Sequence, residues 1–266
     1  MKWIIPYLVL LPAPLFAHEV WLDTTDFYVP AETPISLTLQ NGEEFQGSDL
    51  VYNDRRFVRF ERWHDGRIYP VLGRLGDRPA VSERPLDEGL HVFVHESTMA
   101  QLTYRAWDKF AAFAAHKDFA DIQARHESRG LPETGFKEAY VRYVKALVGV
   151  GGAVGQDQIT GMETEFVALA NPYTDDVAGG MPLQLLYQGA PRADAQVELF
   201  ERAPDGSVQI TLHRTNGQGR VTLPVRAGHD YLVDAVVLRV PSDQVQADTG
   251  AVWETLWASL TFEIPQ

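Results

Sequence analysis

The chain has 266 residues, of which 45% are hydrophobic and 11% aromatic, and 36 Asp and Glu against 23 Lys and Arg give a formal net charge of −13. A chain this apolar is not intrinsically disordered, and its length suits one large domain or two ordinary ones. The acidic balance argues against a nucleic-acid partner, because phosphates require a basic surface. The chain has no cysteine, which excludes disulfides, thiolate metal sites and cysteine nucleophiles.

The first 17 residues read MKWIIPYLVLLPAPLFA, a pattern typical of a cleaved secretory signal peptide. Lys2 provides the positive start, an apolar run follows, and Ala17 is a small residue at the expected cleavage point. The apolar run is too short for a bilayer, which takes ~20 residues to cross, and no other segment is a transmembrane candidate. We therefore expect a periplasmic protein with no membrane span after cleavage.

Cleavage after Ala17 would make His18 the N-terminal residue. A terminal histidine offers both its α-amine and its imidazole to one metal ion, and an amine pKa of ~8 lets a metal displace the proton near neutral pH. Imidazole and amine nitrogens suit copper, nickel, cobalt and zinc. The alternative is that His18 is simply the residue that follows a signal peptide.

Residues 18–105 show the pattern of short β-strands. Ile35, Leu37 and Leu39 alternate with polar residues, which predicts a half-buried strand, and Asn41-Gly42 predicts a turn after it. Further strands are expected at 55–62, 90–96 and 102–107, with a turn at Asp65-Gly66.

Residues 106–150 are predicted to form a helical insertion. A first helix is indicated by an apolar stripe at helical spacing, Trp107, Phe110, Phe113 and Ala114. A second helix is expected over 136–148, with Glu138 and Arg142 as an i, i+4 surface pair. The glycines that begin at Gly149 would end this helix, and 151–163 is expected to be a flexible linker.

Residues 164–266 are predicted to be β again. Seven candidate strands in about a hundred residues fit one β-sandwich, and they lie at 166–169, 183–187, 196–200, 207–214, 219–224, 231–239 and 259–264. The sequence thus predicts a mainly β protein with two β-sandwich domains of Ig-like or transthyretin-like type, at 18–105 and 164–266. The helical insertion and the linker lie between them.

Several stretches resemble one family. They are HEVWL at 18–22, WDKF at 107–110, YVKAL at 143–147 and WETLWASLTFE at 253–263. Together they are similar to an exported domain-of-unknown-function family labelled NikM-like, a periplasmic component of nickel and cobalt uptake. RADAQV at 192–197 resembles the strand entry of a transthyretin-like sandwich. The resemblance covers the mature chain and implies a metal-uptake role, with a membrane transporter or outer-membrane receptor as partner.

The chain departs from this family at one position. Members of the family often carry a histidine near the end of the strand at 232–238, and Val237 stands at that place here. If that histidine is a ligand in other members, this chain must bind the metal differently or not bind that metal.

The eight histidines form no short metal-ligand motif. His91 and His95 would lie ~13 Å apart on one strand, and His116 and His126 ~15 Å apart on one continuous helix. Neither pair can share an ion whose bonds to nitrogen are ~2 Å long. A site must therefore combine distant segments, and the candidate ligands are His18, His95, His116 and His126. Each of the last three also has an ordinary interpretation as a strand-face, solvated or helix-end residue.

We expect an accessory protein, not an enzyme, that binds a nickel, cobalt or copper ion through His18 for metal uptake or handling. Two other functions stay open. One is an oxidative enzyme with a terminal-histidine copper brace, as in lytic polysaccharide monooxygenases. The other is a non-catalytic sandwich that binds a protein or a glycan.

Overall fold

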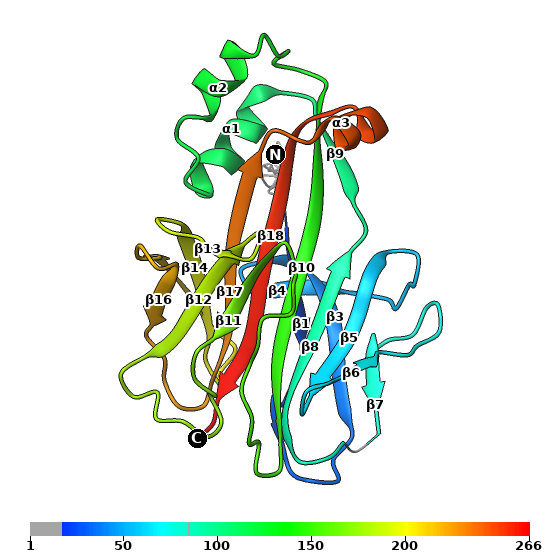
Figure 1. Cartoon of the computed structure of the whole chain (residues 1–266), viewed down its shortest axis with the longest axis vertical. Coiled ribbons are helices and arrows are strands. Elements are labelled where there is room, and N and C mark those ends of the chain that lie inside the picture. The colour runs from blue at the N-terminus through cyan, green and yellow to red at the C-terminus, as the bar shows by residue number, and fades with distance from the viewer. Residues whose placement is uncertain (1–17, 85) are drawn as a thin grey trace, which may run out of the picture.

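A computed structural model describes residues 18–84 and 86–266, so the predicted signal peptide at 1–17 lies outside the described residues. The fold is mainly β, as predicted, and its largest unit is a ten-stranded sheet (Figure 1). The order of this sheet is β15 (Val208–Arg214), β14 (Gln196–Arg202), β17 (His229–Arg239), β18 (Ala251–Ile264), β10 (Phe136–Val150), β8 (Gly89–Ser97), β5 (Phe57–His64) and β6 (Arg67–Pro70). The remaining two strands, β2 (Tyr28–Val29) and β9 (Ala100–Tyr104), pair with β10.

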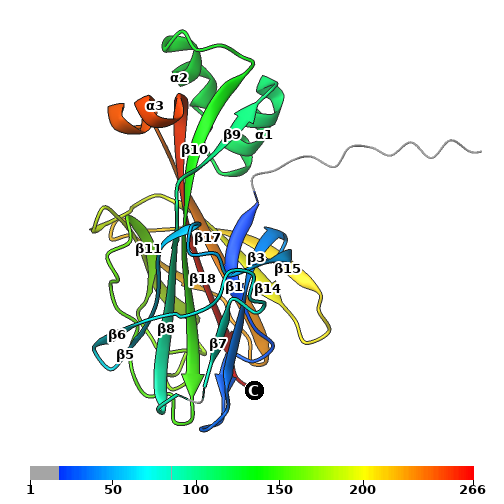
Figure 2. The ribbon, with the colours of Figure 1, turned by 90° about the vertical axis from the view of Figure 1, so that its right-hand side faces the viewer.

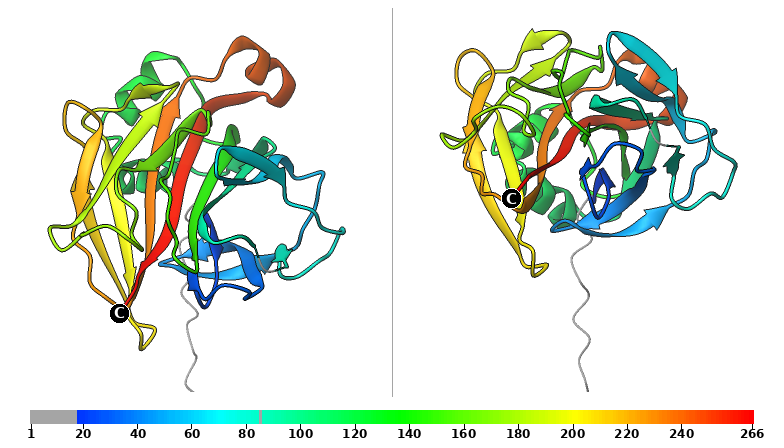
Figure 3. Two further views of the ribbon diagram at one scale, coloured as in Figure 1. Left: turned by 60° about the horizontal axis from the view of Figure 1, so that its bottom comes forward. Right: turned by 90° about the horizontal axis from the view of Figure 1, so that it is seen from below.

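Two smaller sheets cover opposite faces of the large sheet (Figure 3). One consists of β1 (Glu19–Asp23), β3 (Ile35–Glu43), β4 (Gln46–Leu50) and β7 (Val81–Glu83). The other consists of β11 (Thr164–Ala168), β12 (Met181–Tyr187), β13 (Ala190–Pro191) and β16 (Arg220–Leu223). Successive side chains of a strand point to opposite faces, so alternate residues of β10 enter different cores. Val141 and Tyr143 pack toward the second small sheet, and Val144 and Ala146 toward the first.

Helices lie together at one end of the long strands (Figure 2). They are α1 (Trp107–His116), α2 (Ile122–Ser128) and α3 (Asp243–Thr249). The apolar stripe predicted for the first helix is confirmed, because Phe110, Phe113 and Ala114 of α1 are buried. They pack on Trp253 and Trp257 of β18. No helix within 18–84 and 86–266 is long and apolar enough to cross a membrane.

The prediction of a second helix over 136–148 is wrong, because this segment lies within the 15-residue strand β10. β10 runs parallel to β18 and antiparallel to β8. It is buried on both faces, so its apolar residues mark no single face, and its β-branched and aromatic residues favour a strand. Glu138 and Arg142 are accordingly buried rather than a surface pair, and the helical part of the predicted insertion ends at Ser128.

The predicted turn at Asn41-Gly42 is also wrong, since both residues lie within β3. The turn falls at Glu44 and Phe45, which adopt positive φ values of 53° and 59°. Phe45 is buried against Trp21, with ring centroids 5.7 Å apart. Burial of this aromatic ring offsets the cost of a left-handed backbone. The turn predicted at Asp65-Gly66 is confirmed between β5 and β6.

The large sheet joins strands from both halves of the chain. β5, β6 and β8 come from 18–105, and β14, β15, β17 and β18 come from 164–266, where strands lie at each of the seven predicted places. The segment predicted as a linker at 151–163 is held against the sheet by the buried Lys145. Its ammonium bonds Asp157 Oδ1 at 3.2 Å and the carbonyl of Gln158 at 3.1 Å.

Candidate functional site

Strand β1, which begins one residue after His18, is anchored on the large sheet by side chains that bind its backbone. Arg142 Nη2 of β10 donates to the carbonyl of His18 at 2.7 Å. Ser259 Oγ and Thr261 Oγ1 of β18 donate to the carbonyls of Val20 and Leu22, also at 2.7 Å. The sheet therefore fixes the backbone position of His18.

The imidazole of His18 faces a carboxylate. His18 Nδ1 lies 3.3 Å from Glu43 Oε1, which belongs to the last residue of β3. The two atoms are within ion-pair distance when the imidazole is protonated, and the two side chains are 44% and 38% exposed. Both atoms are nevertheless buried, and neither makes a hydrogen bond among residues 18–84 and 86–266. Two ligand atoms at ~2.0–2.1 Å from one ion lie about 2.9 Å apart at the 90° angle of a tetragonal site and about 3.3 Å apart at the tetrahedral angle. The observed spacing therefore suits two ligands of a shared cation.

A cavity of ≈ 530 Å³ is lined by both His18 and His95. His95 lies on β8 and is only 4% exposed, with its ring edge-on to Phe57 and Phe60 at centroid distances of 5.7 and 5.0 Å. Desolvation lowers the pKa of His95 to about 4, so the imidazole is neutral at pH 7. Its Nδ1 has no hydrogen-bond partner in the described part of the chain. A neutral ring nitrogen without a partner is free to act as an acceptor or a ligand.

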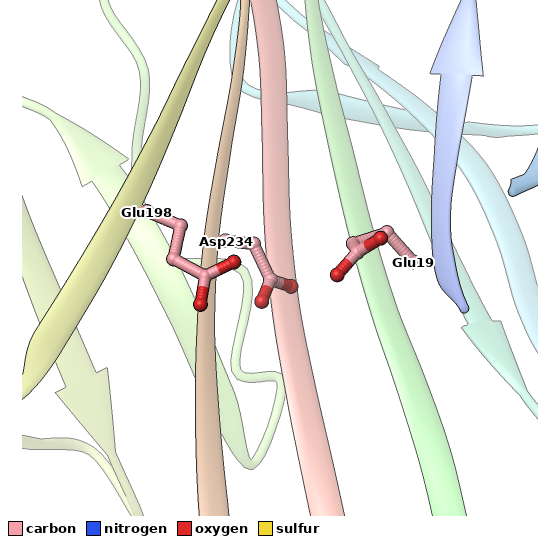
Figure 4. A group of neighbouring side chains, drawn as sticks. All are labelled: Glu19, Glu198 and Asp234. Atoms are coloured by element: carbon pink, nitrogen blue, oxygen red, sulfur yellow. The ribbon is translucent and has the colours of Figure 1, made fainter. Parts of the chain in front are cut away.

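A buried cluster of charges lies on the other side of β1. The ammonium of Lys117, directly after α1, is 3.0 Å from Glu19, 2.8 Å from Glu198 and 2.9 Å from Asp234. Figure 4 shows these three carboxylates, which come from β1, β14 and β17. One carboxylate oxygen from each lies within 4.8 Å of the others, close enough to hold a cation. The Lys117 ammonium bonds all three and takes that place, so the cluster is an internal ion pair network.

Burial and mutual attraction shift the pKa values of the groups in this cluster. Burial raises the pKa of Asp234 to about 7, although the nearby Lys117 opposes this shift. Desolvation lowers the pKa of Lys117, but the three carboxylates outweigh it and hold the pKa above its ordinary value. Desolvation likewise raises the pKa of Glu198, and hydrogen bonds from His116 and Lys117 more than offset it, so that the pKa is lowered. Lys117 therefore stays charged at pH 7.

The other two predicted ligands lie elsewhere. His116 Nε2 is 3.3 Å from Glu198 Oε1 and so belongs to the charge cluster. His126 is 1% exposed, and both of its ring nitrogens are engaged. Nδ1 accepts from Trp253 Nε1 at 3.0 Å, and Nε2 lies 3.0 Å from the carbonyl of Pro132. The structure thus places His18 and His95 on the wall of one cavity and leaves His116 and His126 outside it.

Two residues that the sequence did not single out for this site lie beside His18, Glu43 and Arg142. A third, Lys117, holds the separate charge cluster together. No local pattern marks them, because each acts on a segment far away in the sequence. Val237, where the NikM-like resemblance leads us to expect a histidine, is buried in the core beneath the β11–β12 sheet. It therefore lies on the face of the large sheet that is opposite to the one carrying His18.

No curated protein matches the chain. Among solved structures, the crystal structure of a tetra-tandem repeat in the extending region of a large adhesion protein aligns at 12% sequence identity and a TM-score of 0.23. The alignment covers 93% of this chain and 49% of that chain, so this chain spans about half the length of that one. A family model described as a domain of unknown function, DUF4198, matches residues 15–239, which is most of the chain. The protein therefore belongs to the DUF4198 family.

Proposed function

We propose that the protein binds one transition metal ion, nickel, cobalt or copper, through the N-terminal His18 of a mature periplasmic chain, and serves the uptake or handling of that ion. One observation supports this proposal above the others. Nδ1 of His18 and Oε1 of Glu43 are buried, without hydrogen-bond partners and 3.3 Å apart. A hydrogen-bonded pair would satisfy these atoms, whereas two ligands of one ion need no bond to each other.

The chemistry of the donor set fits these metals. Cleavage after Ala17 would add the α-amine of His18 to its imidazole and so form a chelate. Glu43 would add a carboxylate oxygen, and the neutral imidazole of His95 in the adjoining cavity is a further candidate ligand. Nitrogen and oxygen donors without thiolate suit nickel, cobalt and copper(II). Arg142 would hold the carbonyl of His18 in place, which lowers the cost of ordering the chelate.

The NikM-like resemblance supports a role in transport. In that role, the loaded protein would pass its ion to a membrane transporter or an outer-membrane receptor. The ion is then cargo rather than a catalytic cofactor, and the protein is not an enzyme.

Titration calorimetry with Cu(II) and Ni(II), on protein whose N-terminus is verified as His18 by mass spectrometry, tests the proposal. We expect about one ion per chain, at least a hundredfold weaker binding for His18→Ala, and about tenfold weaker binding for Glu43→Gln. His213→Ala is the matched control, because His213 lies on β15 at the far edge of the large sheet and should leave affinity unchanged.

Three outcomes distinguish the metal-binding proposal from the other two functions. Equal affinity of His18→Ala and His213→Ala would contradict the proposal. Peroxide-driven oxidation of a polysaccharide by the copper-loaded protein would favour the oxidative enzyme. Absence of metal binding would favour a sandwich that binds a protein or glycan.

A further inference from the structure

The cavity beside His18 has the size and walls of a small-molecule site. Its volume of ≈ 530 Å³ falls within the ~300–1,000 Å³ typical of ligand pockets. Tyr52, Phe57 and Phe60 form an aromatic wall in which neighbouring ring centroids lie 5.4–6.2 Å apart. Such a wall buries the apolar body of a ligand.

The charges in this cavity are opposite in sign to those of the protein. The chain carries a net charge of −13, yet the residues that line the cavity include two arginines, Arg56 and Arg142, two histidines and no Asp or Glu. The buried imidazole of His95 is neutral, so the positive charge of the cavity comes from its two arginines. A concave, apolar site with this charge favours an anion. The cavity therefore selects a ligand with a negative group.

Arg142 is the buried charge of this cavity. It is 6% exposed, and its guanidinium lies 3.9 Å above the centroid of the Trp257 ring. Nη2 donates to the carbonyl of His18, while Nε and Nη1 have no hydrogen-bond partner among the described residues. Arg142 forms no ion pair within residues 18–84 and 86–266. The carboxylates of Asp234, Glu138 and Glu19 attract this guanidinium only from beyond ion-pair distance. A ligand carboxylate bonded directly to Nε and Nη1 would compensate the buried cation more fully.

We propose that the cavity binds a small organic carboxylate with an apolar body, with its carboxylate paired with Arg142 and its body against Phe57 and Phe60. This site does not require the metal ion, because its ligand is recognised by Arg142 and the aromatic wall. A carboxylate in the cavity would lie beside His18, so metal and carboxylate can occupy neighbouring places.

The test uses two probes of the same shape, 3-phenylpropionate and the neutral 3-phenylpropan-1-ol, with chelator-treated mature protein. Calorimetry should show binding of the acid at least tenfold tighter than binding of the alcohol. Arg142→Gln should weaken binding of the acid at least tenfold and leave the alcohol unchanged. Arg62→Gln is the matched control, because Arg62 is also buried on this sheet but lies outside the cavity, and it should bind the acid like the wild type.

A second variant keeps the test decisive if Arg142→Gln fails to fold. Ala100→Phe would fill the cavity from β9 without removing a charge, and it should abolish binding of the acid. No binding of either probe by the wild type, or equal affinity for acid and alcohol, would overturn the proposal. Retained acid binding in Ala100→Phe would also overturn it. None of these results bears on the metal proposal, which is tested through His18 and Glu43 with metal alone.

Discussion

Single buried charges connect parts of the chain that are distant in sequence. Lys117 alone links Glu19 of β1, Glu198 of β14 and Asp234 of β17. A buried ion network of this kind adds little to the free energy of unfolding compared with apolar residues of the same shape. Removal of one member, however, leaves buried charges without compensation. Lys117 is therefore the residue whose loss should damage this region most.

Lys117→Met tests this dependence. The variant would leave three buried carboxylates around a neutral side chain, and we expect the free energy of unfolding to fall by about 3–5 kcal/mol. Urea denaturation at pH 7 measures it. Lys109→Met, on the exposed face of α1, is the control and should change stability by less than about 0.5 kcal/mol. Equal stability of the two variants would show that Lys117 is not needed to balance the cluster.

A second residue makes stability depend on pH. Desolvation lowers the pKa of His91 to about 4, and in the neutral form its Nδ1 accepts from Arg62 Nη1 at 3.2 Å, while Nε2 donates to the carbonyl of Asp87 at 2.8 Å. As the pH falls, the imidazole of His91 gains a proton near pH 6.5 in the unfolded chain but only near pH 4 in the folded chain. The contribution of His91 to the free energy of unfolding is therefore fully present above pH 6.5 and is lost as the pH falls toward 4.

We expect this loss to be on the order of 2–3 kcal/mol between pH 7 and pH 4. His91→Gln should flatten the curve of unfolding free energy against pH over that range. His116→Gln should steepen it, because hydrogen bonding to Glu198 raises the pKa of His116 and gives stability on the acidic side. A curve for His91→Gln as steep as that of the wild type would show that His91 is not the source of this pH dependence.

At the scale of elements, patterns with one buried face were predictable and patterns with two were not. The stripe on α1 and the alternation in β3 each mark a single buried face, so both predictions are confirmed. β10 is buried on both faces, and its continuous apolar run fits helix and strand alike. Only its neighbours β18 and β8 decide between the two, and they come from distant parts of the chain.

The small helical region at the end of the sheet is held by His126. It joins α2 to the indole of Trp253 on β18 and to the carbonyl of Pro132. His126→Ala would leave the buried indole N–H of Trp253 without its partner, and we expect a loss of about 1–3 kcal/mol of unfolding free energy. Metal affinity should be unchanged, because His126 lies outside the cavity of His18.

Gln123→Ala, on the exposed face of the same helix, is the matched control and should be close to wild type in stability. Chemical denaturation and metal titration of both variants check this prediction. A loss of metal affinity in His126→Ala alone would make His126 a ligand, as one interpretation of the sequence allowed.

At the scale of the whole molecule, the fold places the predicted mature N-terminus over the face of a sheet built from both halves of the chain. The sequence predicted the mainly β class and the first helix. It also proposed His18 and His95 as metal ligands, and the structure places both on the wall of one cavity. It could not predict Glu43 or Arg142 as neighbours of His18. Those contacts depend on the pairing of β1 with β3 and on the position of β10, and neither pairing has a local signal.

The central claim is that the amine and the imidazole of His18 bind one metal ion together. Its most direct test compares Cu(II) affinity of the chain that begins at His18 with that of a chain carrying one extra alanine before His18. The extra residue moves the amine out of chelating range while every other side chain stays in place. We predict at least a hundredfold weaker binding for the extended chain, and equal affinity of the two chains would contradict the claim.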